Sequence, residues 1–362
     1  MKKLFLLAAT AFALFSCSNG EDVIPEQRTK NVVVQFAPSS LTRAAEGAVA
    51  SGAKAEIKDY AIFFLDAAGN VVKGTATGTA APTDAVACTD VGETAVSVYV
   101  VANTGSSYAN IDLTAITPEN NSTLKTIKDK VALVSKQATI GTVVLANSAK
   151  ADNGKIMIET KDGVTSYSAA VEIAPVVARL EIGKIKGTGG LTGFTLEGIY
   201  IDGHAVEFTV GGGYNKAATG DNITDGIYSI GVDNSLLGAY STSFCDKGLS
   251  MAATKTGNDY IAAPTSSNVW AYQLAAGAPL PSIVVKLSSL SGGNIAKYIT
   301  VNKYTDGSTT YNKPLAPGTV YKIDAISFET KNTAEVPNAE EKNVSVTVTV
   351  KAWEVVNLTP GV

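Results

Sequence analysis

The chain has 362 residues, of which 17% are charged, and its formal net charge at pH 7 is −4. The length predicts about two domains after removal of a leader, and a composition with 33 glycines and abundant Ala, Ser, Thr and Val is typical of an extracellular β protein. The negative balance and the lack of a basic patch argue against a nucleic-acid partner.

The first residues have the pattern of a cleaved leader. Lys2 and Lys3 precede an apolar stretch, 4–14, which is too short for a membrane-spanning helix of about 20 residues. Cys17 follows this stretch, as the lipidated cysteine of a bacterial lipoprotein does. We therefore expect 1–17 to be a lipoprotein signal peptide with Cys17 as the lipid site. The alternative is an ordinary signal peptide with an incidental cysteine.

A first strand is predicted over 31–36. Val32, Val34 and Phe36 fall on one face of it, because successive side chains of a strand point to opposite sides. The loop that follows, 37–47, consists of small and polar residues around Arg43 and Ala44. Loops of this kind are where proteolytic nicking concentrates.

Alternating apolar residues and turn clusters predict many further strands. We expect them over 55–65, 94–103, 156–158, 169–173, 176–182, 194–202, 205–210, 267–273, 282–287, 298–304 and 319–328. The dipeptide Ala174-Pro175 makes a plausible domain boundary. The pattern indicates an all-β chain of two β-sandwich domains.

One helix is predicted, over 123–136. Its apolar residues Leu124, Ile127, Val131 and Val134 recur at spacings of three and four, which places them on one helix face. Ser122 or Thr123 could cap its start. We expect this helix to cover one end of the first β-domain.

The final strand signal is the strongest in the chain. Val344, Val346, Val348 and Val350 alternate with Ser or Thr, and Trp353 follows. Two interpretations remain open at this point. The segment could close the second domain, or it could be donated to a neighbouring subunit.

Residue patterns for catalysis, metals or cofactors are missing from the sequence. His204 is the single histidine, and we expect a hairpin-turn residue rather than a catalytic base. Cys88 and Cys245 are too few and too scattered for zinc, while a disulfide between them stays open. We therefore expect no enzyme activity, no cofactor and no metal.

The chain resembles the FimA/Mfa-like fimbrillins, the subunits of Bacteroidales type V pili. The resemblance covers nearly the whole chain and depends on the order and spacing of several segments together. They are the lipobox at Cys17, the strand 31–36, the Arg43-Ala44 loop, and the segments 96–103, 176–182, 315–323 and 346–353.

This resemblance implies two tandem transthyretin-like β-sandwich domains, with a short helix in the first, over 44–175 and 176–362. It implies an outer-membrane lipoprotein precursor whose propeptide, 18–43, carries the first strand. A surface protease would remove that strand, with Arg43 the expected site and Arg28 the alternative. The partners would be copies of itself and other subunits of a cell-surface pilus, joined by a donor strand that contains Val344, Val346, Val348, Val350 and Trp353.

A different class of function stays open beside this one. Many lipidated β-sandwich proteins are monomeric and bind glycans or host ligands at the cell surface. Exposed aromatic side chains in a groove would support that function, and Trp270 is the only tryptophan outside the C-terminal strand.

Overall fold

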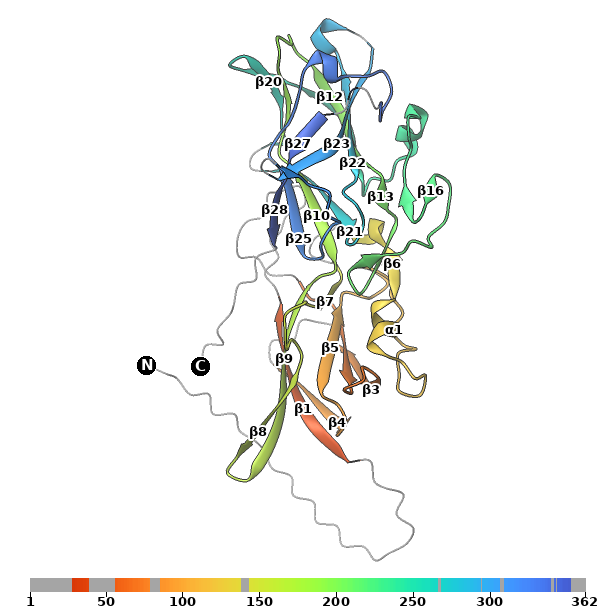
Figure 1. The fold of residues 1–362 in the computed structure, drawn as a ribbon, viewed down its shortest axis with the longest axis vertical. Coiled ribbons are helices and arrows are strands. Elements are labelled where there is room, and N and C mark those ends of the chain that lie inside the picture. Colours follow the sequence, from red (N-terminus) through yellow and green to blue (C-terminus); the bar gives the residue numbers. More distant parts are fainter. Residues whose placement is uncertain are drawn as a thin grey trace, which may run out of the picture.

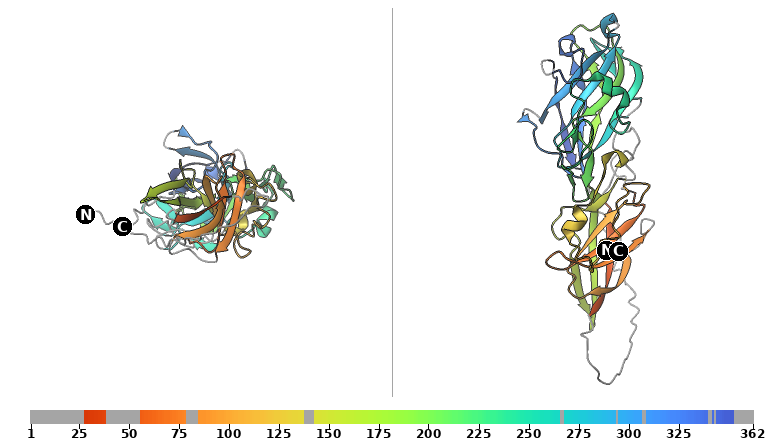
Figure 2. Two further views of the ribbon diagram at one scale, coloured as in Figure 1. Left: turned by 90° about the horizontal axis from the view of Figure 1, so that it is seen from below. Right: turned by 90° about the vertical axis from the view of Figure 1, so that its right-hand side faces the viewer.

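The structure is a computed structural model that describes residues 28–38, 56–78, 85–137, 143–265, 268–293, 295–306, 309–339, 342 and 344–352. Two β-rich bodies are stacked end to end along the longest axis of the molecule (Figure 1), and the right-hand view of Figure 2 shows the same elongated outline. We call them the N-terminal and the C-terminal body.

The N-terminal body is built on one eight-stranded sheet. Seven strands have the order β3-β2-β5-β7-β9-β1-β4, and β8 is the eighth, paired with β9. Its elements are β1 (Thr29–Pro38), β2 (Tyr60–Leu65), β3 (Val71–Gly78), β4 (Val86–Gly92), β5 (Ser97–Ala102), α1 (Leu124–Lys128), β6 (Val131–Leu133), η1 (Val134–Gln137), β7 (Leu145–Asn147), β8 (Ile156–Lys161) and β9 (Val164–Pro175).

This sheet curls around its own core. β3 and β4 stand at opposite ends of the strand order, yet Lys73 of β3 donates a hydrogen bond to the carbonyl of Thr89 on β4. The central strands β2 and β5 bury apolar residues on both faces, among them Phe64 and Val100. Runs of this kind are expected where both faces of a strand are covered.

The C-terminal body contains two four-stranded sheets, β21-β10-β25-β28 and β19-β20-β11-β26, and the six-stranded sheet β18-β12-β22-β23-β24 with β27 on β23. Its strands are β10 (Val177–Ile182), β11 (Ile185–Gly187), β12 (Thr195–Asp202), β13 (His204–Ala205), β14 (Glu207–Thr209), β15 (Gly213–Tyr214), β16 (Ile223–Thr224), β17 (Ile227–Tyr228), β18 (Cys245–Ala252), β19 (Thr254–Thr256), β20 (Asp259–Ala262), β21 (Trp270–Ala275), β22 (Ser282–Ser288), β23 (Lys297–Asp306), β24 (Thr309–Thr310), β25 (Thr319–Ile323), β26 (Ile326–Phe328), β27 (Val344–Thr347) and β28 (Thr349–Ala352). Three 3₁₀ turns complete it: η3 (Asn234–Ala239), η4 (Leu290–Gly292) and η5 (Thr330–Asn332).

The expected fold class is confirmed: the chain is all-β, with two tandem β-sandwiches and a short helix in the first. Several predicted strands are divided. The expected strand 319–328 is two strands, β25 and β26, which pair in different sheets, and 205–210 is likewise split between β13 and β14. The mostly exposed strand β18 carries little apolar alternation, so the sequence did not indicate it.

The prediction of one helix over 123–136 is wrong beyond Lys128. Thr123 does cap α1, in a capping box with Thr126. After the helix, however, β6 pairs antiparallel with β14 of the C-terminal body, with Ala132 opposite Phe208. This pairing satisfies the backbone groups of 131–133, and the tertiary contact therefore overrides the helical periodicity. The same ladder joins the two bodies.

Candidate functional site

β1 lies inside the sheet of the N-terminal body. Along one edge it runs parallel to β9, from Val32 opposite Tyr167 to Pro38 opposite Ile173. Along the other edge it runs antiparallel to β4, from Thr29 opposite Gly92 to Val34 opposite Val86. Figure 1 shows β1 beside β9 in the lower body. The two ladders overlap at residues 32–34, so this middle part of β1 has strand neighbours on both edges.

The side chains of β1 contribute to the core. Val32 and Val34 are both 0% exposed, whereas Gln35 on the opposite face is exposed. Phe36 stands opposite Val171 in the backbone register, and its side chain lies outside the described part of the structure. Near the start of the strand, Lys30 Nζ donates to the carbonyl of Ala95 at 2.6 Å, and burial lowers the pKa of Lys30.

Removal of β1 would open a groove between β9 and β4. Both flanking strands would keep a row of unpaired N–H and C=O groups, which is costly unless another strand pairs with them. The floor of the groove would lose two fully buried valines. Cys88 of β4 stands opposite Val32 and is only 6% exposed while β1 is in place.

The C-terminal segment forms two strands rather than the single strand predicted for it. β27 pairs in parallel with β23, and β28 pairs antiparallel with β25 at the end of the other sheet. Val348 joins them, and its N–H donates to the carbonyl of Thr305 at 2.7 Å. Because the second body closes with two sheets, the segment crosses from one sheet to the other at this residue.

The four valines of this segment are not equivalent. Val344, Val346 and Val348 are 6%, 5% and 0% exposed in their own chain, whereas Val350 is 37% exposed. Each of β27 and β28 has a single strand neighbour among the described residues, so both have one edge without a strand partner. Trp353 lies outside the described residues.

The three arginines differ in accessibility. Arg179 is 2% exposed and its Nε lies 2.7 Å from Glu181 Oε1, so a protease reaches it only after unfolding. Arg28 is exposed directly before β1. Arg43, Ala44 and the expected lipid site Cys17 all lie outside the described residues, and their roles stay predictions.

His204 is buried and begins strand β13, directly after the bend at Gly203, rather than lying in the hairpin turn that the sequence predicted. Its ring stacks on Phe244 with centroids 3.7 Å apart, and Nδ1 donates to the carbonyl of Ile201 at 2.7 Å. Burial lowers the pKa of His204 to about 4, so the ring is neutral at pH 7. It is a packing residue of the C-terminal body.

The two other side chains considered for chemistry are also buried. No disulfide joins Cys88 and Cys245, which lie one in each body, so the disulfide left open by the sequence is not formed. Within the described residues, no three His, Cys, Asp or Glu side chains gather as a metal site would require.

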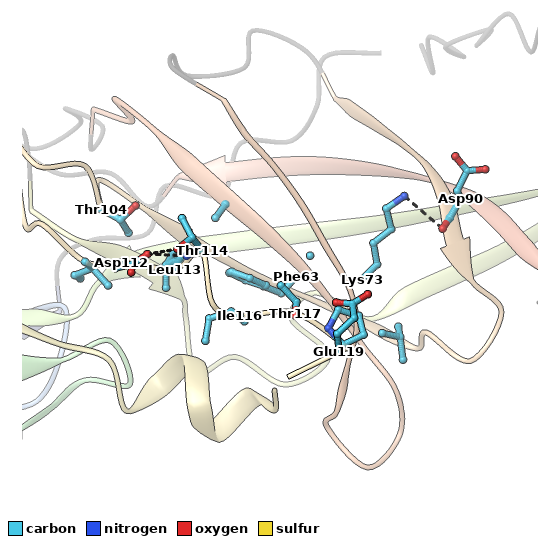
Figure 3. A pocket seen from close by; sticks show the side chains of 15 residues that line it. Phe63, Lys73, Asp90, Thr104, Asp112, Leu113, Thr114, Ile116, Thr117 and Glu119 are labelled. Atoms are coloured by element: carbon cyan, nitrogen blue, oxygen red, sulfur yellow. Dashed lines mark hydrogen bonds between the residues drawn. The ribbon is translucent and has the colours of Figure 1, made fainter. Parts of the chain in front are cut away.

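A cavity of about 710 Å³ lies on the N-terminal body (Figure 3). Phe63 and Ile116 contribute apolar walls, and Lys73, Asp112 and Glu119 contribute charges. Phe63 is only 3% exposed and Trp270 is 4% exposed in the C-terminal body. Neither aromatic side chain therefore offers the exposed stacking surface that the glycan-binding alternative calls for.

No helix in the described ranges has the length and apolarity needed to traverse a bilayer.

Comparison with known proteins gives matches only among solved structures; no protein-family model and no curated protein sequence matches the chain. A fimbrillin from Porphyromonas gingivalis matches with a TM-score of 0.51 at 11% identity, covering 91% of this chain and 99% of the other. The chain has the fold of a fimbrillin.

Two further structures share this fimbrillin fold. A candidate cell adhesion protein from Bacteroides eggerthii has a TM-score of 0.51 at 17% identity, over 90% of this chain and 96% of the other. A second one, from Parabacteroides distasonis, has a TM-score of 0.51 at 12% identity, over 91% and 98%. The resemblance read from the sequence is thus confirmed at the level of the fold.

Proposed function

We propose that the chain is a structural subunit of a cell-surface pilus, with domains over 44–175 and 176–362, that polymerises by strand exchange and supports adhesion. The observation that carries the proposal is the position of β1, an N-terminal strand that is hydrogen-bonded on both edges and fills the core with Val32 and Val34.

The strand that would fill the groove left by β1 is the C-terminal segment. In the precursor it stays on its own chain, where β27 and β28 occupy outer positions of two sheets. After cleavage between Arg43 and Ala44, the segment leaves those positions and fills the groove of the next subunit, which restores the ladder and the apolar contacts. One groove and one donor per subunit make a head-to-tail contact, which builds an open filament.

The expected life cycle begins at the outer membrane. Lipid on Cys17 tethers the precursor, a surface protease removes 18–43, and the mature subunit joins a pilus with copies of itself and other subunits. The function requires no catalytic residue, cofactor or metal.

We expect cleavage to expose the thiol of Cys88. In a soluble Cys17→Ala precursor, neither Cys88 nor Cys245 should react readily, because they are 6% and 4% exposed. After an arginine-specific protease has acted at Arg43, Cys88 should react with a thiol reagent until filaments form, and then become protected again. Thiol mass labelling, N-terminal sequencing and electron microscopy of one time course measure this.

Two controls accompany the labelling experiment. Cys245 in the C-terminal body should stay unreactive throughout, and Arg43→Ala should keep Cys88 protected and prevent filaments. A mature N-terminus at Thr29, or filaments in which β1 is still present, would show that strand removal is not the switch.

We also expect Cys17→Ala to release the precursor from the membrane. A single acyl chain binds membranes only marginally, and stable anchoring takes more than one; a lipidated bacterial N-terminus supplies three. Fractionation of cells that express the full-length chain should move the variant from the membrane to the soluble fraction. Quantitative retention of Cys17→Ala in the membrane fraction would contradict the proposed anchor.

A further inference from the structure

The segment just ahead of the C-terminal strands is tied firmly to the C-terminal body. Ala334 and Tyr298 exchange two backbone hydrogen bonds, at 2.8 and 2.9 Å. Next to them, Lys297 Nζ lies 2.9 Å from Glu335 Oε1. Residues 334–338 are thus held to the start of β23 before the chain turns into β27.

Asn338 donates three hydrogen bonds from this segment to the C-terminal body. Its N–H donates to Thr300 Oγ1 at 2.8 Å, and its Nδ2 donates both to Asp202 Oδ2 at 2.8 Å and to the carbonyl of Gly231 at 2.7 Å. The backbone of Asn338 is left-handed, with φ of 52°, a conformation in which asparagine is enriched. One residue therefore connects this segment to three separate parts of the body.

The carboxylate of Asp202 makes this attachment costly to break. Asp202 is 2% exposed, and it also accepts hydrogen bonds from Ser229 Oγ at 2.8 Å and from the N–H of Ile230 at 2.9 Å. Burying a carboxylate is costly unless hydrogen-bond donors replace the lost water, and hydrogen bonds to a charged acceptor are stronger than those between neutral groups. Of the donors to Asp202, Asn338 is the one that belongs to the C-terminal segment.

The chain beyond Asn338 is held differently. β27 and β28 each pair with a single strand, on the outer edge of their sheets, and no comparable side-chain network to a buried charge holds them in the described residues. We propose that Asn338 is the fixed point of strand exchange: residues up to 338 stay on the C-terminal body, and the donated arm begins directly after them. This inference rests on the proposed pilus function.

The proposal is tested by hydrogen exchange on the full-length precursor. Asn338→Ala removes two donors and should speed exchange of the β27 amides by about tenfold relative to wild type, since a bond to a charged group contributes about 1.5–3 kcal/mol. Ser229→Ala is the matched control, because it also removes a 2.8 Å bond to Asp202 Oδ2 but leaves the C-terminal segment untouched. Its β27 amides should exchange as in wild type. Asn338→Gly, which accepts a left-handed backbone without strain, should behave as Asn338→Ala does.

In wild-type filaments the amides of Ala334 and Asn338 should stay protected while the arm has changed partner. Equal β27 exchange in Asn338→Ala and Ser229→Ala, or loss of protection at Ala334 and Asn338 in filaments, would overturn the proposal. Should Asn338→Ala not fold, Asn338→Gly gives the same comparison. Failure of the wild-type chain to form filaments would refute the pilus function instead, and the precursor comparison would still test the anchor.

Discussion

Replacing Val350 with aspartate is expected to abolish filaments while leaving the melting temperature of the precursor unchanged. In the precursor, Val350 is 37% exposed, so a charge at this position stays in contact with water. In a donated strand that places Val344, Val346 and Val348 in the groove of β1, Val350 follows the same alternation and is buried. Strand donation would thus move Val350 from the exposed position it has in its own chain to a buried one in the next subunit.

The expected loss is large. A buried valine contributes about 1.5–3 kcal/mol, and an unpaired carboxylate in its place adds a further penalty, so binding of the arm should weaken by more than about 100-fold. Electron microscopy after cleavage and a thermal melt of the uncleaved chain measure the two effects separately.

Thr349→Asp is the matched control for Val350→Asp. Thr349 is exposed in the precursor and has the opposite parity in the donated strand, so its variant should keep both the melting temperature and the filaments. Filaments of normal yield from Val350→Asp would refute donation in this register. The pair Val346→Asp and Val348→Asp is less informative, because both residues are buried in their own chain and the precursor itself would be destabilised.

Val34→Asp should destabilise the precursor strongly and have no effect on the mature subunit. Val34 is 0% exposed in a strand paired on both edges, and an unpaired charge buried there costs roughly 3–5 kcal/mol of folding free energy. The proposed cleavage after Arg43 would remove residue 34, so mature chains from the variant and the wild type would have the same sequence. Urea unfolding of both precursors and both filaments measures the difference.

Gln35→Asp serves as the control for Val34→Asp, because Gln35 is exposed on the other face of β1 and its variant should unfold like the wild type. Filaments from Val34→Asp that unfold at a lower urea concentration than wild-type filaments would mean that β1 is retained. The proposed maturation would then be wrong, whatever the fold.

Much of the architecture could be predicted from the sequence, because the alternation of apolar and polar residues shows directly which face of a strand is buried. Val32 and Val34 share a core face in β1, and the apolar runs of β2, β5 and β10 are strands buried on both sides. The cap at Thr123 was also predictable, since it depends only on residues within one turn of the helix.

Other features depend on which strands pair with each other across long stretches of sequence. The alternation of apolar and polar residues does not show which strand a segment will pair with. Residues 131–133 have helical spacing, yet β6 pairs with β14 across the two bodies. The residues of β1 alone would also fit an edge strand. Only its pairing with both β9 and β4 means that removing β1 would open a groove in the sheet.

The C-terminal segment shows most clearly what the sequence could predict and what depended on the tertiary structure. Its four valines predicted one continuous strand face, because a two-residue alternation shows only which side chains share a face. The folded chain bends this face at Val348 between two sheets, so three valines are buried and Val350 is left half open. Likewise, nothing local to Asn338 indicates its bond to Asp202, 136 residues away. Side-chain pattern indicated many of the strands, though not β6 or β18. Long-range packing alone determined which strands are paired on both edges and which have a free edge.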